Sequence, residues 1–265
     1  MNLGLQGKKA LVTGSTAGIG FATAQALAAE GAHVTVNGRD PARVAAAVER
    51  LRRDLPASAS VDGVAADLSS GDGCRALIAR VPSVDVLVNN MGVFEPKPFE
   101  QITDEDWLRF FETNVLSGIR LARHYVGGMR VRNWGRIVFI SSESALQIPT
   151  EMIHYGMTKT AQLAVSRGLA ETLAGTGVTV NSVLPGPTSS EGVATFVARM
   201  GKARGVDAAT AEREFFATAR PSSLLQRFAT PTEVAAMVAY VCSAQASATT
   251  GAALRVDGGV VRAIA

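Results

Sequence analysis

A tyrosine and a lysine stand four residues apart in the stretch IHYGMTKTA at residues 153–161. In a helix this spacing is about one turn, so Tyr155 and Lys159 would project from the same face. A phenol has an ordinary pKa of about 10, and a neighbouring cation favours its ionised form. The pair therefore has the composition of an acid–base catalyst and the cation that tunes it. A core helix with a snorkelling lysine would show the same spacing, so the surrounding elements must decide.

A glycine-rich segment, TGSTAGIG at residues 13–20, joins a predicted strand at 8–14 to a predicted helix at 18–30. Glycine allows the main chain to turn tightly and to approach a ligand closely. The start of the helix offers free N–H groups and a positive dipole end, which suit a pyrophosphate. The spacing is G-x-x-x-G-x-G, and its strand–helix context favours dinucleotide binding over a turn without a ligand.

The second predicted strand ends in the sequence VNGRD. NAD-binding proteins usually place an acidic residue at this point to hold a ribose hydroxyl. Here Gly38 leaves room, and Arg39 supplies a guanidinium fork for a phosphate. We therefore predict NADP(H) in preference to NAD(H), with a solvated loop charge as the alternative for Arg39. Asp40 is a competing ribose ligand, but its place before Pro41 is typical of a helix N-cap.

The segment after Pro41 shows the clearest helical periodicity. Apolar residues recur at Val44, Ala47, Val48 and Leu51, which is the i, i+3, i+4, i+7 pattern of one helix face. We expect this face to be buried.

Short β-branched segments alternate with alanine-rich helical segments along the whole chain. Apolar strands that alternate with helices are typical of a parallel sheet covered on both faces. We predict an α/β fold, a single doubly wound Rossmann-like domain over residues 1–265 with a seven-stranded parallel sheet. The predicted strands are 8–14, 33–37, 61–67, 84–90, 135–142, 178–186 and 252–256, and the predicted helices are 18–30, one after Asp40-Pro41, 71–81, 104–132, 153–174 and 231–243.

Composition excludes several other classes of protein. The formal charge is +3, but basic and acidic residues are interspersed, so we expect no nucleic-acid partner. Cys74 and Cys242 belong to no Cys/His cluster, which favours reduced core thiols and no bound metal. No apolar stretch reaches membrane-spanning length and no secretory signal is evident, so we expect a cytoplasmic protein with no membrane partner.

The order and spacing of these motifs resemble the short-chain dehydrogenase/reductase family over nearly the whole chain. Each motif is modest alone, and their joint order makes the resemblance specific. The matching residues are TGSTAGIG (13–20), Asp67, NNMG (89–92), Asn114, ISS (140–142), YGMTK (155–159) and PGPT (185–188).

The resemblance implies a catalytic tetrad. Tyr155 would protonate the carbonyl oxygen during reduction and act as the base in the reverse direction. Lys159 would lower the pKa of the tyrosine and hold the nicotinamide ribose. Ser142, rather than its neighbour Ser141, would hydrogen-bond the substrate oxygen. Asn114 would hold a water that links Lys159 to solvent.

The same resemblance implies where the dinucleotide lies. Residues after the third strand would hold the adenine, Asn90 would lie beside the adenosine ribose, and the PGPT segment would surround the nicotinamide and its phosphate. The implied cofactor-binding residues are Gly14, Ser15, Thr16, Gly18, Ile19, Gly20, Arg39, Asp67, Leu68, Asn90, Gly92, Tyr155, Lys159, Pro185, Gly186 and Thr188.

A long insertion at about 188–222 occupies the place of the substrate lid in the family. We expect its apolar residues to wall a substrate pocket or to contact a neighbouring subunit, with Gly201 and Gly205 as hinges. The loop at 143–153 would form the opposite wall. The residues concerned are Val193, Phe196, Val197, Met200, Phe215 and Phe216 in the insertion, and Gln147, Glu151 and Met152 in the loop.

We therefore expect an NADP(H)-dependent enzyme that interconverts a ketone and a secondary alcohol. A 3-oxoacyl chain, a cyclic ketone and a sugar derivative all remain open as substrates. The alternatives are a dinucleotide-binding sensor or scaffold without catalysis, and an epimerase or dehydratase that retains its cofactor. The resemblance also implies a homotetramer.

Overall fold

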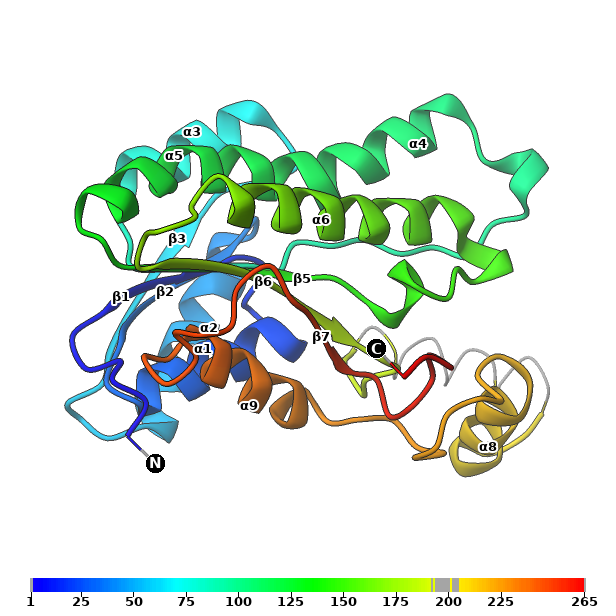
Figure 1. Cartoon of the computed structure of the whole chain (residues 1–265). Helices are drawn as coiled ribbons and strands as arrows, with labels where there is room; N and C mark the ends of the chain where they lie inside the picture. Colours follow the sequence, from blue (N-terminus) through cyan, green and yellow to red (C-terminus); the bar gives the residue numbers. More distant parts are fainter. Residues whose placement is uncertain (1, 192, 194–200, 202–204, 265) are drawn as a thin grey trace.

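The structure is a computed structural model that describes residues 2–191, 193, 201 and 205–264. Its strands are β1 (Lys9–Val12), β2 (His33–Gly38), β3 (Ser60–Ala65), β4 (Val86–Asn89), β5 (Gly135–Ile140), β6 (Val178–Pro185) and β7 (Ala253–Val256). Within the described residues these seven strands pair in parallel in the order β3-β2-β1-β4-β5-β6-β7 (Figure 1). The direction of winding reverses between β1 and β4, which confirms the predicted doubly wound, Rossmann-like α/β fold.

Helices cover both faces of the sheet. In Figure 1, α1, α2 and α9 lie on one face, and α3, α4, α5 and α6 lie on the other. The short helix α8 lies apart from both layers, beyond one edge of the sheet. The bounds are α1 (Gly18–Ala29), α2 (Pro41–Asp54), α3 (Gly71–Arg80), α4 (Asp104–Phe111), α5 (Ser117–Val131), α6 (Ile153–Glu171), α8 (Ala208–Thr218) and α9 (Pro231–Cys242).

The sheet separates two buried apolar cores. Side chains alternate between the faces of a strand, so Val86 and Val88 of β4 enter one core and Leu87 enters the other. The two cysteines are free and buried, with Cys242 in the first core and Cys74 in the second. The thiols are therefore core residues on opposite sides of the sheet.

Helix α2 begins and packs as its sequence predicts. The Asp40 carboxylate accepts hydrogen bonds from the N–H groups of Ala42 at 2.8 Å and Arg43 at 3.3 Å, and Pro41 occupies the first turn. The predicted apolar stripe is buried along its whole length, at Val44, Ala47, Val48 and Leu51.

The long helical region predicted at 104–132 is present, but it is not one uninterrupted α-helix. A π-helical turn at Glu112–Leu116 separates α4 from α5. The Asn114 side chain there exchanges two hydrogen bonds with the main chain of Val93, at 2.8 and 3.0 Å. Such single π turns are frequent at functional sites. Periodicity does not reveal this one, because the stabilising contact comes from a distant loop.

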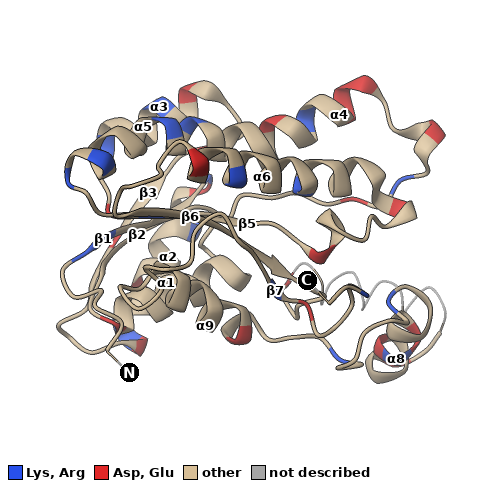
Figure 2. Cartoon of the chain, in the orientation of Figure 1, with Lys and Arg blue, Asp and Glu red and all other residues tan. Residues whose placement is uncertain are grey.

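The charged residues form no single-sign face in this view. Lysine and arginine are interspersed with aspartate and glutamate over the helices (Figure 2). Among the described residues, no helix is both long enough and apolar enough to cross a membrane.

Two glycines of α5 give a matched test of this packing. A Cβ at Gly118 would lie 2.9 Å from a ring carbon of the buried Phe139, whereas nothing lies within 4 Å of one at Gly127. We expect Gly118→Ala to lower the free energy of unfolding by about 1–3 kcal/mol through overpacking. Gly127→Ala is expected to raise it by up to about 1 kcal/mol through helix propensity. Urea unfolding measures both, and equal effects of the two variants would contradict the packing described.

Candidate active site

The glycine-rich loop after β1 is tightly packed against α1 and β4. Gly14 and Gly18 both have φ of +56°, which favours glycine. A Cβ at Gly20 would lie 2.4 Å from the Gly14 carbonyl oxygen. The Asn90 amide supports the loop by donating to the carbonyl oxygens of Thr13 at 3.1 Å and Gly14 at 2.9 Å. The loop shape is therefore set by contacts that leave no space for side chains.

The N-terminus of α1 has no side-chain cap, a feature that it shares with α5 and α6 among the described helices. Asp40, Ser70 and Thr230 cap α2, α3 and α9, whereas Ala17 has no side-chain acceptor to offer α1. The first turn of α1 also carries no acidic residue. Free amide groups and a positive dipole end therefore face the glycine loop, which fits the pyrophosphate of a dinucleotide.

The end of β2 fits the predicted ribose-phosphate region. A Cβ at Gly38 would lie 2.7 Å from Cγ2 of Thr16, so a larger residue there would displace that side chain. Arg39 is exposed beside it. The carboxylate of Asp40 is engaged as the cap of α2, which argues against its role as a ribose ligand.

Two residues expected to hold the adenine lie after β3. Asp67 is exposed, and its carboxylate accepts hydrogen bonds from Ser69. Leu68 is fully buried in the second core. Any contact of Leu68 with a cofactor must therefore come from its main chain.

Helix α6 places Tyr155 in its first turn and Lys159 one turn later. The Lys159 amine is buried, 5.6 Å from the centroid of the Tyr155 ring. It donates to the carbonyl oxygen of Ile140 at 2.9 Å and to Oε1 of Gln162 at 3.3 Å. Burial disfavours the charged amine and lowers the pKa of Lys159 to about 8.

The pKa of the Tyr155 phenol shifts in the opposite direction to the one that the family resemblance implies. Burial raises the pKa of Tyr155, and the negative charge of Glu143 raises it further. A hydrogen bond with Ser142 and the charge of Arg220 oppose this shift without overcoming it. The amine of Lys159 is directed to the carbonyl oxygen of Ile140 at the end of β5.

The two serines after β5 have different partners. Ser141 donates its hydroxyl to the carbonyl oxygen of Lys159 at 2.9 Å and so fastens α6 to the sheet. Ser142 donates to Oε2 of Glu143 at 2.5 Å and accepts from the N–H of Ser144 at 3.1 Å. Because the hydroxyl of Ser141 is committed to the main chain, Ser142 is the better candidate for a substrate contact.

Gln162 links Asn114 to Lys159. Its amide nitrogen donates to the main-chain oxygen of Asn114 at 2.5 Å, and its amide oxygen accepts from Lys159. The sequence analysis expected Asn114 to hold a water that links Lys159 to solvent, which stays a prediction, and it did not single out Gln162. Its spacing from Lys159 was a usable signal, since three residues along a helix share a face.

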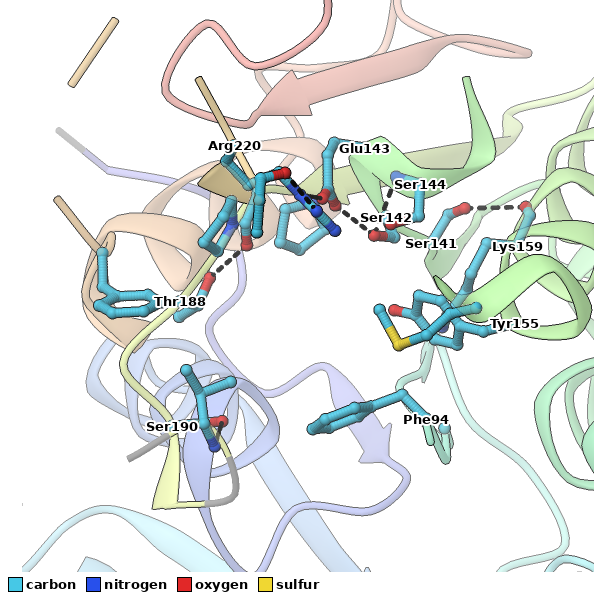
Figure 3. A pocket seen from close by; sticks show the side chains of 18 of the residues that line it. Phe94, Ser141, Ser142, Glu143, Ser144, Tyr155, Lys159, Thr188, Ser190 and Arg220 are labelled. Atoms are coloured by element: carbon cyan, nitrogen blue, oxygen red, sulfur yellow. Dashed lines mark hydrogen bonds and ion pairs between the residues drawn. The ribbon is translucent and has the colours of Figure 1, made fainter. Parts of the chain in front are cut away.

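These elements enclose a cavity of about 460 Å³ (Figure 3). Nine of the predicted site residues line it, namely Ile19, Asn90, Gly92, Ser142, Tyr155, Lys159, Pro185, Gly186 and Thr188. The others lie outside its lining: Gly14, Ser15, Thr16, Gly18, Gly20, Arg39, Asp67, Leu68 and Asn114. The cavity thus joins the reactive side chains to one end of the glycine loop.

The wall expected from the insertion and the 143–153 loop is present in part. Val193, Phe215, Glu151 and Met152 line the cavity, whereas Phe216 is buried behind it and Gln147 is not among the lining residues. Phe196, Val197 and Met200 lie outside the described residues. Sequence reasoning missed further lining residues: Phe94, Pro96, Glu143, Arg220 and Phe228.

His154 does not belong to the site. Neighbouring residues on a helix point about 100° apart, which predicts packing for His154. Its ring lies 4.1 Å from that of Phe110 and 6.0 Å from that of Trp107 between centroids. Burial accordingly lowers the pKa of His154.

Known proteins share this fold and this order of motifs. A family model described as enoyl-(acyl carrier protein) reductase matches residues 14–261. The chain is 47% identical to the uncharacterized oxidoreductase YvaG of Bacillus subtilis, over all of both chains. It is 31% identical to the 3-oxoacyl-[acyl-carrier-protein] reductase FabG of Aquifex aeolicus, covering 98% of this chain and 100% of that one. The structure of L-sorbose reductase from Gluconobacter frateurii, complexed with NADPH and L-sorbose, matches with a TM-score of 0.94 at 31% identity, over all of both chains.

The fold, the glycine loop and the Tyr–Lys cavity together define a dinucleotide-dependent class of enzymes. The chain belongs to the short-chain dehydrogenase/reductase family and is an oxidoreductase.

The buried amine of Lys159 gives a pH test on the cofactor-free protein. Its native pKa is about 8, below the value of about 10.4 for an exposed lysine. Between these values the unfolded chain binds more protons, so the contribution of Lys159 to stability becomes more favourable as pH rises. The free energy of unfolding of the native protein, minus that of Lys159→Met, is expected to increase by up to roughly 3 kcal/mol from pH 7 to pH 10. Urea unfolding at both pH values measures this difference, and a constant value would contradict the shift.

Proposed function

We propose that the protein is an NADP(H)-dependent oxidoreductase that interconverts a ketone and a secondary alcohol. The observation that carries this proposal is the convergence of Tyr155, Ser142 and Lys159 on one cavity that reaches the glycine loop. The uncapped N-terminus of α1 and the close-packed loop fit a dinucleotide. When bound, the nicotinamide would supply or accept the hydride, and the protein would supply position and proton transfer.

Each side chain of the cavity has a distinct role in this proposal. Tyr155 donates its proton to the carbonyl oxygen during reduction and accepts it in the reverse direction. Ser142 donates a hydrogen bond that orients the same oxygen. Lys159 holds the ribose and supplies the cation, while Gln162 and Asn114 fix its position. The insertion at 188–222 acts as the lid over the substrate.

We infer a preference for NADP(H) over NAD(H) from the end of β2. A side chain at position 38 would meet Thr16, and the neighbouring exposed Arg39 would bind the ribose phosphate. The relatives support this choice, since the matching L-sorbose reductase was solved with NADPH.

A homotetramer is also part of the proposal, by family resemblance, with α5 and α6 contributing to one interface. Light scattering that gives a monomer mass at assay concentration would contradict it.

Removal of one hydroxyl tests the chemistry. We expect Tyr155→Phe to lower kcat for ketone reduction by at least about 100-fold, because the variant lacks the proposed proton donor. The assay follows NADPH oxidation by absorbance with a panel of ketones, diketones, 3-oxoacyl thioesters and keto-sugars, and gives kcat for each substrate. The matched control is Tyr240→Phe on α9, whose ring is exposed and absent from the cavity lining.

The same assay separates the alternative functions. Native protein that binds NADPH and turns over no member of the panel would favour a sensor or scaffold. Product formation without net consumption of the cofactor would favour epimerisation or dehydration.

Arg39 gives a test of cofactor choice. We expect Arg39→Leu to lower kcat/KM for NADPH by about 10-fold or more, because a charge-assisted phosphate contact is lost. The same substitution should change kcat/KM for NADH little. Arg53→Leu near the end of α2, where Arg53 pairs with Asp54, serves as the control. Equal losses of kcat/KM with NADPH and NADH would show that Arg39 does not bind the ribose phosphate.

A further inference from the structure

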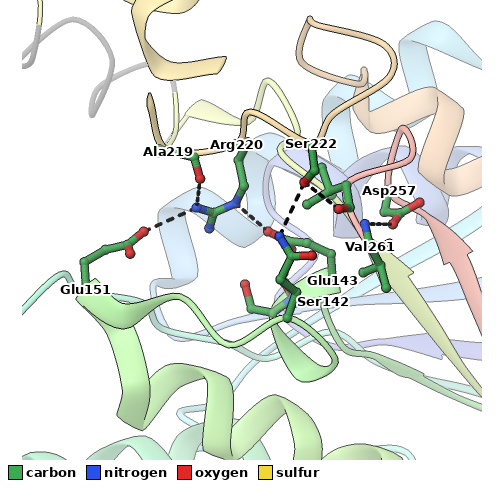
Figure 4. A network of polar contacts seen from close by, with 12 residues as sticks. Ser142, Glu143, Glu151, Ala219, Arg220, Ser222, Asp257 and Val261 are labelled. Atoms are coloured by element: carbon green, nitrogen blue, oxygen red, sulfur yellow. Dashed lines mark hydrogen bonds and ion pairs between the residues drawn. The ribbon is translucent and has the colours of Figure 1, made fainter. Parts of the chain in front are cut away.

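Three charged side chains form one polar wall of a cavity whose other walls are largely apolar (Figure 4). Arg220 donates from Nε to Oε1 of Glu143 at 3.0 Å, and its Nη1 lies 3.3 Å from Oε1 of Glu151. Glu143 is 5% exposed and Arg220 is 8% exposed. Two carboxylates face one guanidinium, so this polar wall carries a formal charge of −1.

Glu143 is joined directly to a residue of the proposed mechanism. Its Oε2 accepts the hydroxyl of Ser142 at 2.5 Å. A serine hydroxyl carries a single proton and can donate it to one acceptor only. When Ser142 donates to a substrate carbonyl, Oε2 of Glu143 must lose this hydrogen bond. A buried carboxylate oxygen left without a donor is strongly disfavoured.

Among the described residues, no hydrogen bond from the neighbouring cation reaches Oε2 of Glu143. Arg220 directs Nε to the other oxygen of Glu143 and Nη1 to Glu151 and to the carbonyl oxygen of Ala219 at 2.7 Å. A substrate with a hydroxyl on the carbon next to its carbonyl carries a donor close to the oxygen that Ser142 binds. Such a hydroxyl can take the place of the Ser142 proton at Oε2.

We propose that Glu143, held by Arg220, binds a hydroxyl group on the carbon adjacent to the substrate carbonyl. The preferred substrates are then uncharged hydroxy ketones with an apolar or hydroxylated remainder. A carboxylate at the same carbon is rejected, because it brings no donor and meets the negative charge of the wall. This inference rests on the ketone–alcohol chemistry proposed above and selects among its possible substrates.

Three compounds with one carbon skeleton test the proposal. Hexan-2-one, 1-hydroxyhexan-2-one and 2-oxohexanoate share a butyl ketone, and the carbon on the other side of the carbonyl is a methyl, a hydroxymethyl or a carboxylate group. With NADPH, we expect kcat/KM of the native protein to be at least about 10-fold higher for the hydroxy ketone than for hexan-2-one. The value for 2-oxohexanoate is expected to be the lowest of the three.

A binding measurement separates this inference from the chemistry on which it rests. In Tyr155→Phe with NADPH present, quenching of cofactor fluorescence reports the dissociation constant of each compound without turnover. Tighter binding of the hydroxy ketone by about 10-fold supports hydroxyl recognition even if native protein reduces no ketone, an outcome that would contradict only the proposed function. Equal kcat/KM and equal affinity for the hydroxy ketone and hexan-2-one would overturn the inference and leave ketone reduction standing. Loss of both turnover and preferential binding would overturn both.

Substitution assigns the preference to the residue. Glu143→Gln keeps the size of the side chain and removes its charge. The ratio of kcat/KM for the hydroxy ketone to kcat/KM for hexan-2-one should therefore fall toward one. Discrimination against 2-oxohexanoate should weaken in the same variant. Glu171→Gln, which alters an exposed carboxylate paired with Arg167 on α6, should leave both ratios unchanged. If Glu143→Gln does not fold, as judged by thermal unfolding, the native comparison of the three compounds still decides the proposal.

Discussion

Parallel pairing forces every strand of this sheet to end at the same edge, and each return path must cross a face of the sheet as a helix. At that edge β1 delivers the glycine loop, β4 delivers Asn90, β5 delivers Ser142 and β6 delivers the segment from Pro185. These residues are far apart in sequence, and the parallel pairing of the strands is what brings them together. The site is therefore a direct consequence of register among the central strands, supported by two apolar cores that hold the helices in place.

Burial at this edge also changes the chemistry of the groups placed there. The hydroxyl of Ser141 and the amine of Lys159 both bond to the main chain across the junction of β5 and α6, which brings the helix close to the sheet. The same closeness removes water from the amine and from the phenol of Tyr155. Desolvation opposes charge on both, so the pKa of the lysine falls and that of the tyrosine rises. The close packing of α6 on the sheet therefore both fixes the side chains of Tyr155 and Lys159 and shifts their pKa values.

In the function proposed above, reactivity and substrate contact fall to different parts of the chain. The proposed reactive groups lie at strand ends and on α6. Arg220, Phe215 and Phe228 come from the region after β6 and line the same cavity, where Arg220 lies beside Glu143 (Figure 3). Glu143 joins the two parts, because it contacts both Ser142 and Arg220. Variation in the later segment can thus alter which substrate is held while the proton donor stays in place.

Much of this architecture was predictable because its signals are local. Alternation of strands and helices indicated the sheet, Asp40 and Pro41 marked the start of α2, and the periodicity from Val44 to Leu51 showed its buried face. The order of the motifs along the chain, through the family resemblance that rests on it, singled out Tyr155 and Lys159.

Only the tertiary structure decided the contacts between distant segments. Glu143 and Arg220 are 77 residues apart, and Gln162 and Asn114 are 48 apart, so no local pattern couples them. The direction of the Tyr155 pKa shift likewise depends on the burial that folding imposes on the phenol, and then on the charges that it brings near. Sequence by itself determined the elements and the reactive residue types, because propensity, capping and periodicity act over a few residues. Folding decided their partners and acidity, because hydrogen bonding and desolvation depend on the neighbours that the fold supplies.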